Sequence, residues 1–248
     1  MAKDLFSTQS DLYAKYRPAY PKELYDHIFS YVKEKHTAWD CATGNGQAAV
    51  VLADHFKKVM ATDISAAQID KAVHKDNVEY LVCPAESTPF ANNSFDLVTV
   101  AQAYHWLKWD AFKKEVTRVG KPGAVIAVWM YGGHRTDDEK INEIRRDFYE
   151  NITSPYWESE RKYVDDNYVT ADFDYELLPT KEFRIALHWN RQDWLGYIST
   201  WSAVQKYSKI NGHSPIPFID EKTKNLWPEN EMKNVVFPVY LKLGRVVK

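Results

Sequence analysis

The sequence predicts an α/β fold, in which a doubly wound, mostly parallel sheet of seven strands ends in an antiparallel C-terminal strand and carries an inserted helical and aromatic cap. Short apolar segments alternate with amphipathic segments through the first half of the chain, and this alternation is typical of βαβ units whose strands are buried on both faces. The 248 residues, of which 45% are hydrophobic, are enough for one large core with an insertion.

The first half supplies five of the seven strands, and each is an apolar segment bounded by polar or turn residues. Strands are predicted at residues 37–43, 57–65, 77–85, 94–103 and 123–130, and helices at residues 46–56, 66–75 and 110–119. The turn from Gly120 to Gly123 marks the start of the fifth strand. Because helices join successive strands, these strands should run parallel.

The second half completes the sheet and adds the cap. Helical periodicity covers residues 136–152, and an irregular aromatic and charged stretch precedes a sixth strand at residues 181–190. A long helix rich in tryptophan and tyrosine is predicted at residues 191–210, and the alternating segment 235–247 suits the final antiparallel strand.

Four regions are therefore expected along the chain. Residues 1–36 would form an N-terminal lid, and residues 37–131 the ligand-binding core. Residues 132–180 would be a cap inserted over the carboxyl edge of the sheet, and residues 181–248 would complete the sheet and add an aromatic cap helix.

Composition excludes several classes of protein. The formal net charge of −2 provides no overall positive field for nucleic acid. No apolar run approaches the roughly 18 residues of a membrane span and no signal peptide is visible, so a cytoplasmic protein is expected. Cys41 and Cys83 fall in predicted strands without a CxxC pattern, and the eight histidines are scattered, so no metal site is expected. Neither a nucleophile elbow nor a Walker A loop is present.

The stretch "WDCATGNGQ" links the first strand to the first helix through two glycines, Gly44 and Gly46. In open α/β sheets a ligand lies beyond the carboxyl ends of the strands, where glycines let it approach the backbone. "GNGQAA" satisfies the loose dinucleotide pattern, and Asp63 ends the second strand, where an acidic residue would hold a ribose. An NAD-dependent oxidoreductase is therefore one interpretation, and a cofactor-binding protein without catalysis is another.

Asp40 favours a different cofactor. It precedes Gly44 by four residues, where the pyrophosphate of a dinucleotide would make a carboxylate unfavourable. S-adenosylmethionine carries an ammonium group and a sulfonium instead, and a carboxylate can accept hydrogen bonds from the former. The charge pattern therefore indicates a methyl donor.

Four ordered motifs between about residues 37 and 130 strengthen this interpretation: "WDCATGNGQ", "VMATDIS", "CPAESTPFANNSFDLVTVAQAYHW" and "RVGKPGAVIAVW". Together they resemble the class I S-adenosylmethionine-dependent methyltransferases, especially the small-molecule branch that includes trans-aconitate methyltransferase-like proteins. "YAKYRPAYP" and "DWLGYISTWSAVQKY" are also similar to segments of that branch. The resemblance implies a Rossmann-like fold, S-adenosylmethionine as cofactor and a small-molecule acceptor.

The resemblance also assigns roles to residues at the ends of the strands. It implies that Asp40, Gly44 and Gly46 surround the methionine end of the cofactor, that Asp63 holds the ribose, that Ile64 packs on the adenine, that Ala85 and Glu86 lie near the adenine amino group, and that Ala101 borders the sulfonium. The chain departs from the family at Ala42, where the turn usually has glycine. For Asp63 and Glu86 the alternatives are a helix cap and a solvated loop residue.

The segment "AQAYHWLKW" should bring Tyr104, His105, Trp106 and Trp109 to the mouth of the site. His105 is the candidate catalytic base, because histidine titrates closest to neutral pH; the alternative is that it packs against the cap. A carboxylate acceptor would need no base. O-methylation is the preferred reaction.

Two further groups of side chains complete the prediction. Tyr13 and Arg17 lie in a segment stiffened by prolines and are expected to close over the cofactor, with Arg17 paired to its carboxylate or to an acidic substrate. The alternative is an N-terminal strap that buries tyrosines. The cap tryptophans are expected mainly in the core: Trp157, Trp189, Trp194 and Trp201. Neither nucleic acid nor a membrane is an expected partner.

Overall fold

The computed structural model describes residues 16–248. Five parallel strands form the central part of its sheet, in the spatial order β3-β2-β1-β4-β5. They are β1 (Thr37–Cys41), β2 (Lys58–Asp63), β3 (Val78–Val82), β4 (Phe95–Ala101) and β5 (Gly120–Tyr131). The final strand, β9 (Lys233–Arg245), runs antiparallel to β5. The predicted fold class, a mostly parallel sheet with an antiparallel C-terminal strand, is thus confirmed.

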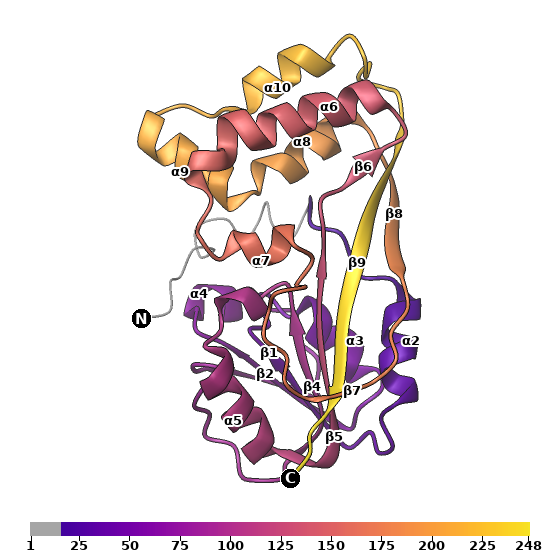
Figure 1. Ribbon diagram of the computed structural model, residues 1–248, viewed down its shortest axis with the longest axis vertical. Coiled ribbons are helices and arrows are strands. Elements are labelled where there is room, and N and C mark those ends of the chain that lie inside the picture. Colours follow the sequence, from indigo (N-terminus) through magenta and orange to yellow (C-terminus); the bar gives the residue numbers. More distant parts are fainter. Residues whose placement is uncertain (1–15) are drawn as a thin grey trace.

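The sheet of the described chain contains nine strands rather than the predicted seven. The two additional strands are β6 (Arg135–Thr136) and β7 (Glu176–Leu177), each two residues long, which is too short for an alternating pattern to be visible in the sequence. Both pair with β9, as does β8 (Phe183–Trp189). The 13-residue β9 therefore continues past the parallel strands toward the cap (Figure 1).

Helices cover both faces of the sheet, as a doubly wound fold requires. On one face, α2 (Lys22–Ser30) and α3 (Gln47–Ala53) pack on alternate strand residues such as Ala38 and Leu97. On the other face, α5 (Trp109–Val119) packs on Trp39 and Val98. Neighbouring strand residues thus belong to opposite cores, which is why these strands are apolar throughout.

Two predicted helices differ in the structure. The helix expected at residues 66–75 ends after one turn, as α4 (Ala66–Ile69), because Val73 is bonded elsewhere: its N–H donates to Asn45 O and its carbonyl accepts from the Tyr80 hydroxyl. Cys83, expected within the third strand, lies one residue beyond β3.

The long helix expected at residues 191–210 is two helices, α8 (Arg191–Ser199) and α9 (Ser202–Asn211). The break falls at Thr200 and Trp201, where Trp201 takes an extended ψ of 133°. The carbonyl of Thr200 accepts a hydrogen bond from Arg17 (3.2 Å), and a local pattern of residues contains no sign of this tertiary contact.

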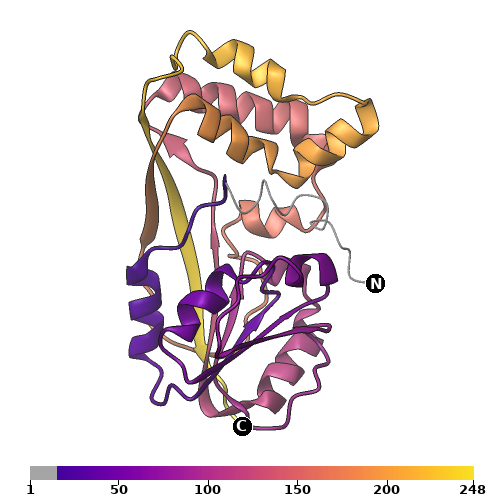
Figure 2. The ribbon, with the colours of Figure 1, turned by 180° about the vertical axis from the view of Figure 1, so that it is seen from behind.

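A layer of helices lies beyond the carboxyl ends of the strands. It contains α6 (Glu139–Asp147), which continues into the π-helical turn η2 (Phe148–Thr153), together with α8, α9 and α10 (Ile216–Thr223). Between this layer and the sheet lies α7 (Arg161–Asp165), as Figures 1 and 2 show from opposite sides. The cap is therefore assembled from segments on both sides of β8.

Candidate functional site

The β1–α3 turn has a left-handed backbone conformation at both of its glycines. Gly44 and Gly46 have φ angles of 58° and 86°, in the left-handed region. A Cβ atom on Gly46 would lie 2.3 Å from the Tyr80 hydroxyl oxygen, so a side chain is excluded there by space as well as by φ. Ala42 has a φ of 53°, also left-handed, at the position where the family turn usually has glycine.

Asp63 connects this turn to the end of β2. Its Oδ2 accepts a hydrogen bond from the N–H of Gly44 and its Oδ1 accepts one from the N–H of Ser65, both 2.9 Å long. Ser65, not Asp63, is the N-cap of α4, because its hydroxyl accepts from the N–H of Gln68. Next to Asp63, Ile64 is 40% exposed, so an apolar side chain lies open to a ligand at the strand edge.

Asp40 lies underneath the glycine turn and is 1% exposed. Its carboxylate accepts hydrogen bonds from the hydroxyls of Thr99 (2.7 Å) and Thr43 (2.5 Å). Burial and the nearby charge of Asp63, opposed by these hydrogen bonds, raise the pKa of Asp40 to about 6. The Asp40 carboxylate therefore holds the turn in shape, and a cation near it would be favoured.

The remaining predicted cofactor residues lie along the same edge. Ala85 is buried in the loop after β3, and Ala101 ends β4. The Glu86 carboxylate accepts a hydrogen bond from the N–H of Lys108 (3.0 Å). Tyr13 lies outside the described residues. The structure thus brings together the strand ends at which the sequence placed a cofactor, and the contacts with a cofactor stay predictions.

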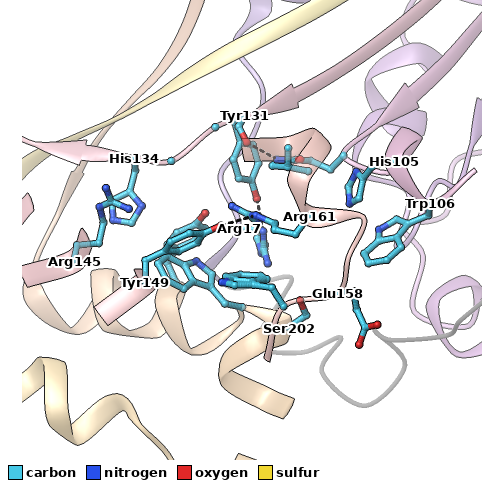
Figure 3. A pocket seen from close by; sticks show the side chains of 17 residues that line it. Arg17, His105, Trp106, Tyr131, His134, Arg145, Tyr149, Glu158, Arg161 and Ser202 are labelled. Atoms are coloured by element: carbon cyan, nitrogen blue, oxygen red, sulfur yellow. Dashed lines mark hydrogen bonds between the residues drawn. The ribbon is translucent and has the colours of Figure 1, made fainter. Parts of the chain in front are cut away.

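A cavity of about 80 Å³ lies between the carboxyl ends of β4 and β5 and the helical cap (Figure 3). Residues of the N-terminal segment, of both strand ends, of the short helical turn η1 (Tyr104–Trp106) and of α6, η2, α7, α8 and α9 surround it. The described residues that line it are Arg17, Gln102, His105, Trp106, Tyr131, Gly132, Gly133, His134, Arg145, Tyr149, Trp157, Glu158, Arg161, Val164, Tyr197, Trp201 and Ser202.

Basic side chains dominate the charge of this cavity. Three arginines line it, Arg17, Arg145 and Arg161, whereas Glu158 is the one carboxylate among its described lining residues. Glu158 is itself paired with Lys206 (2.8 Å). An anionic ligand would therefore be attracted into the cavity.

Two of the arginines are held by neighbouring groups. Arg17 donates to the Tyr131 hydroxyl (2.7 Å) and lies over the Tyr197 ring at 5.4 Å, so it connects the N-terminal segment to β5 and the cap. The Arg161 guanidinium is bonded to Asp165 (3.0 Å) and lies over the Trp157 ring at 4.3 Å.

His105 lines the cavity and is 8% exposed. Its Nδ1 lies 2.8 Å from the hydroxyl of Tyr168. Burial, together with the positive charge of Arg161, lowers the pKa of His105 to about 3. The imidazole is therefore neutral at pH 7, where it can donate or accept a hydrogen bond but is a weak base.

The aromatic run around His105 divides between the cavity and the core. Trp106 lines the cavity, whereas Tyr104 is 2% exposed, stacks on Trp109 and donates to the carbonyl of Asp172. Tyr104 and Trp109, which were expected at the mouth of the site, are therefore not among the residues that line the cavity. Of the cap tryptophans, Trp157 and Trp201 line the cavity, and Trp194 and Trp189 pack in the core.

Sequence reasoning missed most of the residues that line the cavity, among them the polar side chains of Gln102, His134, Arg145 and Arg161. A signal existed for one of them. Arg145 follows the buried Ile141 by four residues and precedes the buried Phe148 by three, so it lies on the apolar side of an amphipathic helix, where an arginine is unusual.

Within residues 16–248, no group of three or more histidine, cysteine, aspartate or glutamate side chains is arranged to hold a metal ion. None of the helices in that part is long and apolar enough to cross a membrane.

Comparisons with known proteins agree with the geometry. Residues 39–128 match the family model of a methyltransferase domain. Over 98% of its length the chain is 35% identical to a protein of Dictyostelium discoideum named as a methyltransferase, of which the match covers 95%. It is 26% identical, over 75% of its length and 67% of the relative, to methyltransferase cfoB of Aspergillus candidus. A solved structure from Anaeromyxobacter dehalogenans, described as a type II methyltransferase, is 33% identical with a TM-score of 0.85; the match covers 93% of this chain and 98% of that one.

Proposed function

We propose that this chain, which belongs to the class I S-adenosylmethionine-dependent methyltransferases, transfers a methyl group from S-adenosylmethionine to a small acidic molecule. The acceptor atom is a carboxylate oxygen of that molecule. The observation behind the acidic acceptor is the basic cavity at the carboxyl edge of the sheet. An NAD-dependent oxidoreductase is not favoured, because the relatives that match nearly the whole length of the chain are named as methyltransferases.

The residues at the strand ends fit the proposed cofactor. Gly44 leaves the backbone of the turn open to a ligand, whereas the Tyr80 hydroxyl fills the space beside Gly46. The exposed Ile64 provides an apolar surface beside Asp63. The buried Asp40, with its raised pKa, would be stabilised as a carboxylate by a nearby cation. We infer that these residues hold the cofactor. When bound, S-adenosylmethionine supplies an electrophilic methyl group, whose transfer to a carboxylate releases no proton.

The acceptor would lie in the cavity. Gln102, the residue after Ala101, lines the cavity, so the cavity reaches the strand end at which the resemblance places the sulfonium. Its arginines would attract a carboxylate, and its tryptophans would exclude water from the reacting atoms. A carboxylate is ionised and nucleophilic at neutral pH, so His105 need not remove a proton. We propose that His105, neutral because of its burial, orients the acceptor by a hydrogen bond.

The test is an assay of the purified protein with S-adenosylmethionine and a panel of small mono- and dicarboxylic acids. Formation of S-adenosylhomocysteine, together with a base-labile methyl ester of one acid, would support the proposal. Calorimetry with S-adenosylhomocysteine and with NADH separates the alternatives. Binding of NADH alone would revive the oxidoreductase, and binding of S-adenosylhomocysteine without turnover on any acceptor would favour a non-catalytic binding protein.

A further inference from the structure

The cap side of the cavity contains three buried hydrogen-bond donors that have no acceptor. They are Nδ1 of His134, Nε of Arg145 and Nε1 of Trp157, and none has a hydrogen-bond partner within residues 16–248. All three residues line the cavity. Because most buried polar groups in proteins are hydrogen-bonded, three unsatisfied donors around one cavity indicate that a ligand supplies the acceptors.

The contacts of His134 determine which of its ring nitrogens carries the proton, and they hold the ring in one orientation. The indole N–H of Trp194 donates to Nε2 of His134 over 2.7 Å. An indole nitrogen can only donate, so Nε2 is unprotonated and the proton of the neutral ring is on Nδ1. The His134 side chain is 1% exposed and packs against the rings of Tyr197 and Phe237, with centroids 5.2 Å and 5.1 Å away. Its Nδ1–H is therefore held in place.

Arg145 adds a charge beside this donor. It is half-buried on α6 and forms no ion pair with any residue between 16 and 248. The pKa of His134 is lowered mainly by its own burial and then by the positive charge of Arg145. Figure 3 shows the two side chains next to each other. A Cβ atom on Gly133 would lie 3.7 Å from an Nη of Arg145, so the backbone before His134 also runs close to the guanidinium. Even a partly buried charge without a counterion is unfavourable.

We propose that His134 and Arg145 form a carboxylate-binding subsite, which holds a second, non-reacting carboxylate of the acceptor. This inference rests on the proposed function. Figure 3 shows His134 and Arg145 on the side of the cavity opposite His105 and Trp106, and Gln102 follows the strand end at which the methyl group would arrive. A carboxylate bound by a guanidinium is a poorer nucleophile, because its charge is neutralised. The acceptor is therefore a dicarboxylate, methylated at the end that lies away from Arg145.

The experiment compares Arg145→Met with Arg146→Met, a matched control. Arg146 is the next residue of the same helix, but its side chain is 52% exposed and pairs with Glu139 outside the cavity. The probes are succinate, glutarate and adipate and the monocarboxylates of equal length, each titrated into protein saturated with S-adenosylhomocysteine. The wild-type protein and R146M should bind one of the dicarboxylates more tightly than its monocarboxylate. R145M should lose about 10- to 100-fold of that preference, as expected for a charge-assisted hydrogen bond.

A second variant tests the histidine without removing the partner of Trp194. His134→Gln offers a carbonyl oxygen to the Trp194 indole and lacks the Nδ1–H, so it should also reduce the dicarboxylate preference. Without any acid, R145M should have a melting temperature equal to or above that of the wild type, because a partly buried charge without a counterion is removed. This readout shows that a loss of binding is not a loss of folding.

The outcomes separate this inference from the proposed function. If R145M keeps the preference, or if the wild type binds dicarboxylates no better than monocarboxylates, the subsite is wrong, even when a methyl ester of another acid is formed. If dicarboxylate binding depends on Arg145 but no acid is methylated, the subsite stands and the proposed carboxylate methylation is wrong.

Discussion

The carboxylate of Asp63 accepts a hydrogen bond of 2.9 Å from the backbone N–H of Gly44, 19 residues earlier in the chain. β1 and β2 are parallel neighbours that end at the same edge, so one side chain at the end of β2 can determine the shape of the turn after β1. The same carboxylate also accepts from the N–H of Ser65. Asp63 thus shapes the surface on which a cofactor would rest.

We expect Asp63→Asn to weaken binding of S-adenosylhomocysteine by 10-fold or more. The substitution replaces one of the two carboxylate oxygens by an NH₂ group, which donates hydrogen bonds. The backbone N–H of either Gly44 or Ser65 therefore loses its acceptor, which lowers the free energy of unfolding by about 1–3 kcal/mol. Calorimetric titration measures the affinity and urea denaturation the stability. Asp54→Asn is the control, because Asp54 is a surface partner of Lys75 and its loss should change stability by less than about 0.5 kcal/mol. Unchanged affinity in D63N would contradict the ribose-binding role.

The φ of 53° at Ala42 predicts a substitution that stabilises the protein. Left-handed backbone is unfavourable for a residue with a Cβ atom, so Ala42→Gly should raise the free energy of unfolding by about 1 kcal/mol. Urea denaturation measures the difference. Ala48→Gly, within α3, should instead lower it by at least about 0.5–1 kcal/mol. If both substitutions destabilise the protein, strain at Ala42 is not significant.

The fold, and the meeting of Gly44 and Asp63 at one edge of the sheet, were predictable because local patterns determine them. Apolar strands alternating with amphipathic helices specify a parallel sheet, and parallel neighbours bring Gly44 and Asp63 to one edge whatever the details of packing. Helix ends were less predictable. The helix α4 ends at Ile69 because the backbone of Val73 is hydrogen-bonded to Asn45 and to the Tyr80 hydroxyl instead. These contacts form only in the folded chain.

The cavity was not predictable for a related reason. His134 follows β5, Arg145 lies on α6 and Trp194 lies on α8, so their meeting depends on how the cap packs over the sheet. That Arg145 lacks a carboxylate partner becomes visible only when all its neighbours are known. The sequence contains 34 acidic residues, and no pattern of spacing shows that none of the described ones reaches Arg145.

Asp40 should make stability depend on pH in the mildly acidic range. Burial raises its pKa to about 6 from the ordinary 3.8, so between these values the folded state binds the proton and the unfolded chain does not. The free energy of unfolding should therefore fall as pH rises from about 4 to 6, by up to about 3 kcal/mol from this group. Denaturation curves between pH 4.5 and 7.5 measure the slope, and Asp40→Asn should flatten it.

The same titration tests whether Asp40 faces the positive groups of the cofactor. A cation favours the carboxylate, so the affinity for S-adenosylmethionine should rise between pH 5 and 7 in the wild type and should stay flat in D40N. Parallel pH dependences in the two proteins would show that Asp40 only holds the turn, through Thr43 and Thr99.

His105 distinguishes a carboxylate acceptor from one that must lose a proton. With a pKa lowered to about 3 by burial and by Arg161, the imidazole is neutral throughout the range from pH 6.5 to 8.5, so kcat should not change with a histidine titration there. His105→Gln should lower kcat by less than about 10-fold, whereas loss of a general base costs about 10²- to 10⁴-fold. Tyr168→Phe removes the hydrogen bond to Nδ1 and keeps the ring, so it controls for packing. A loss of 100-fold or more in H105Q, with Y168F near the wild type, would mean that the acceptor is a hydroxyl or an amine deprotonated by His105.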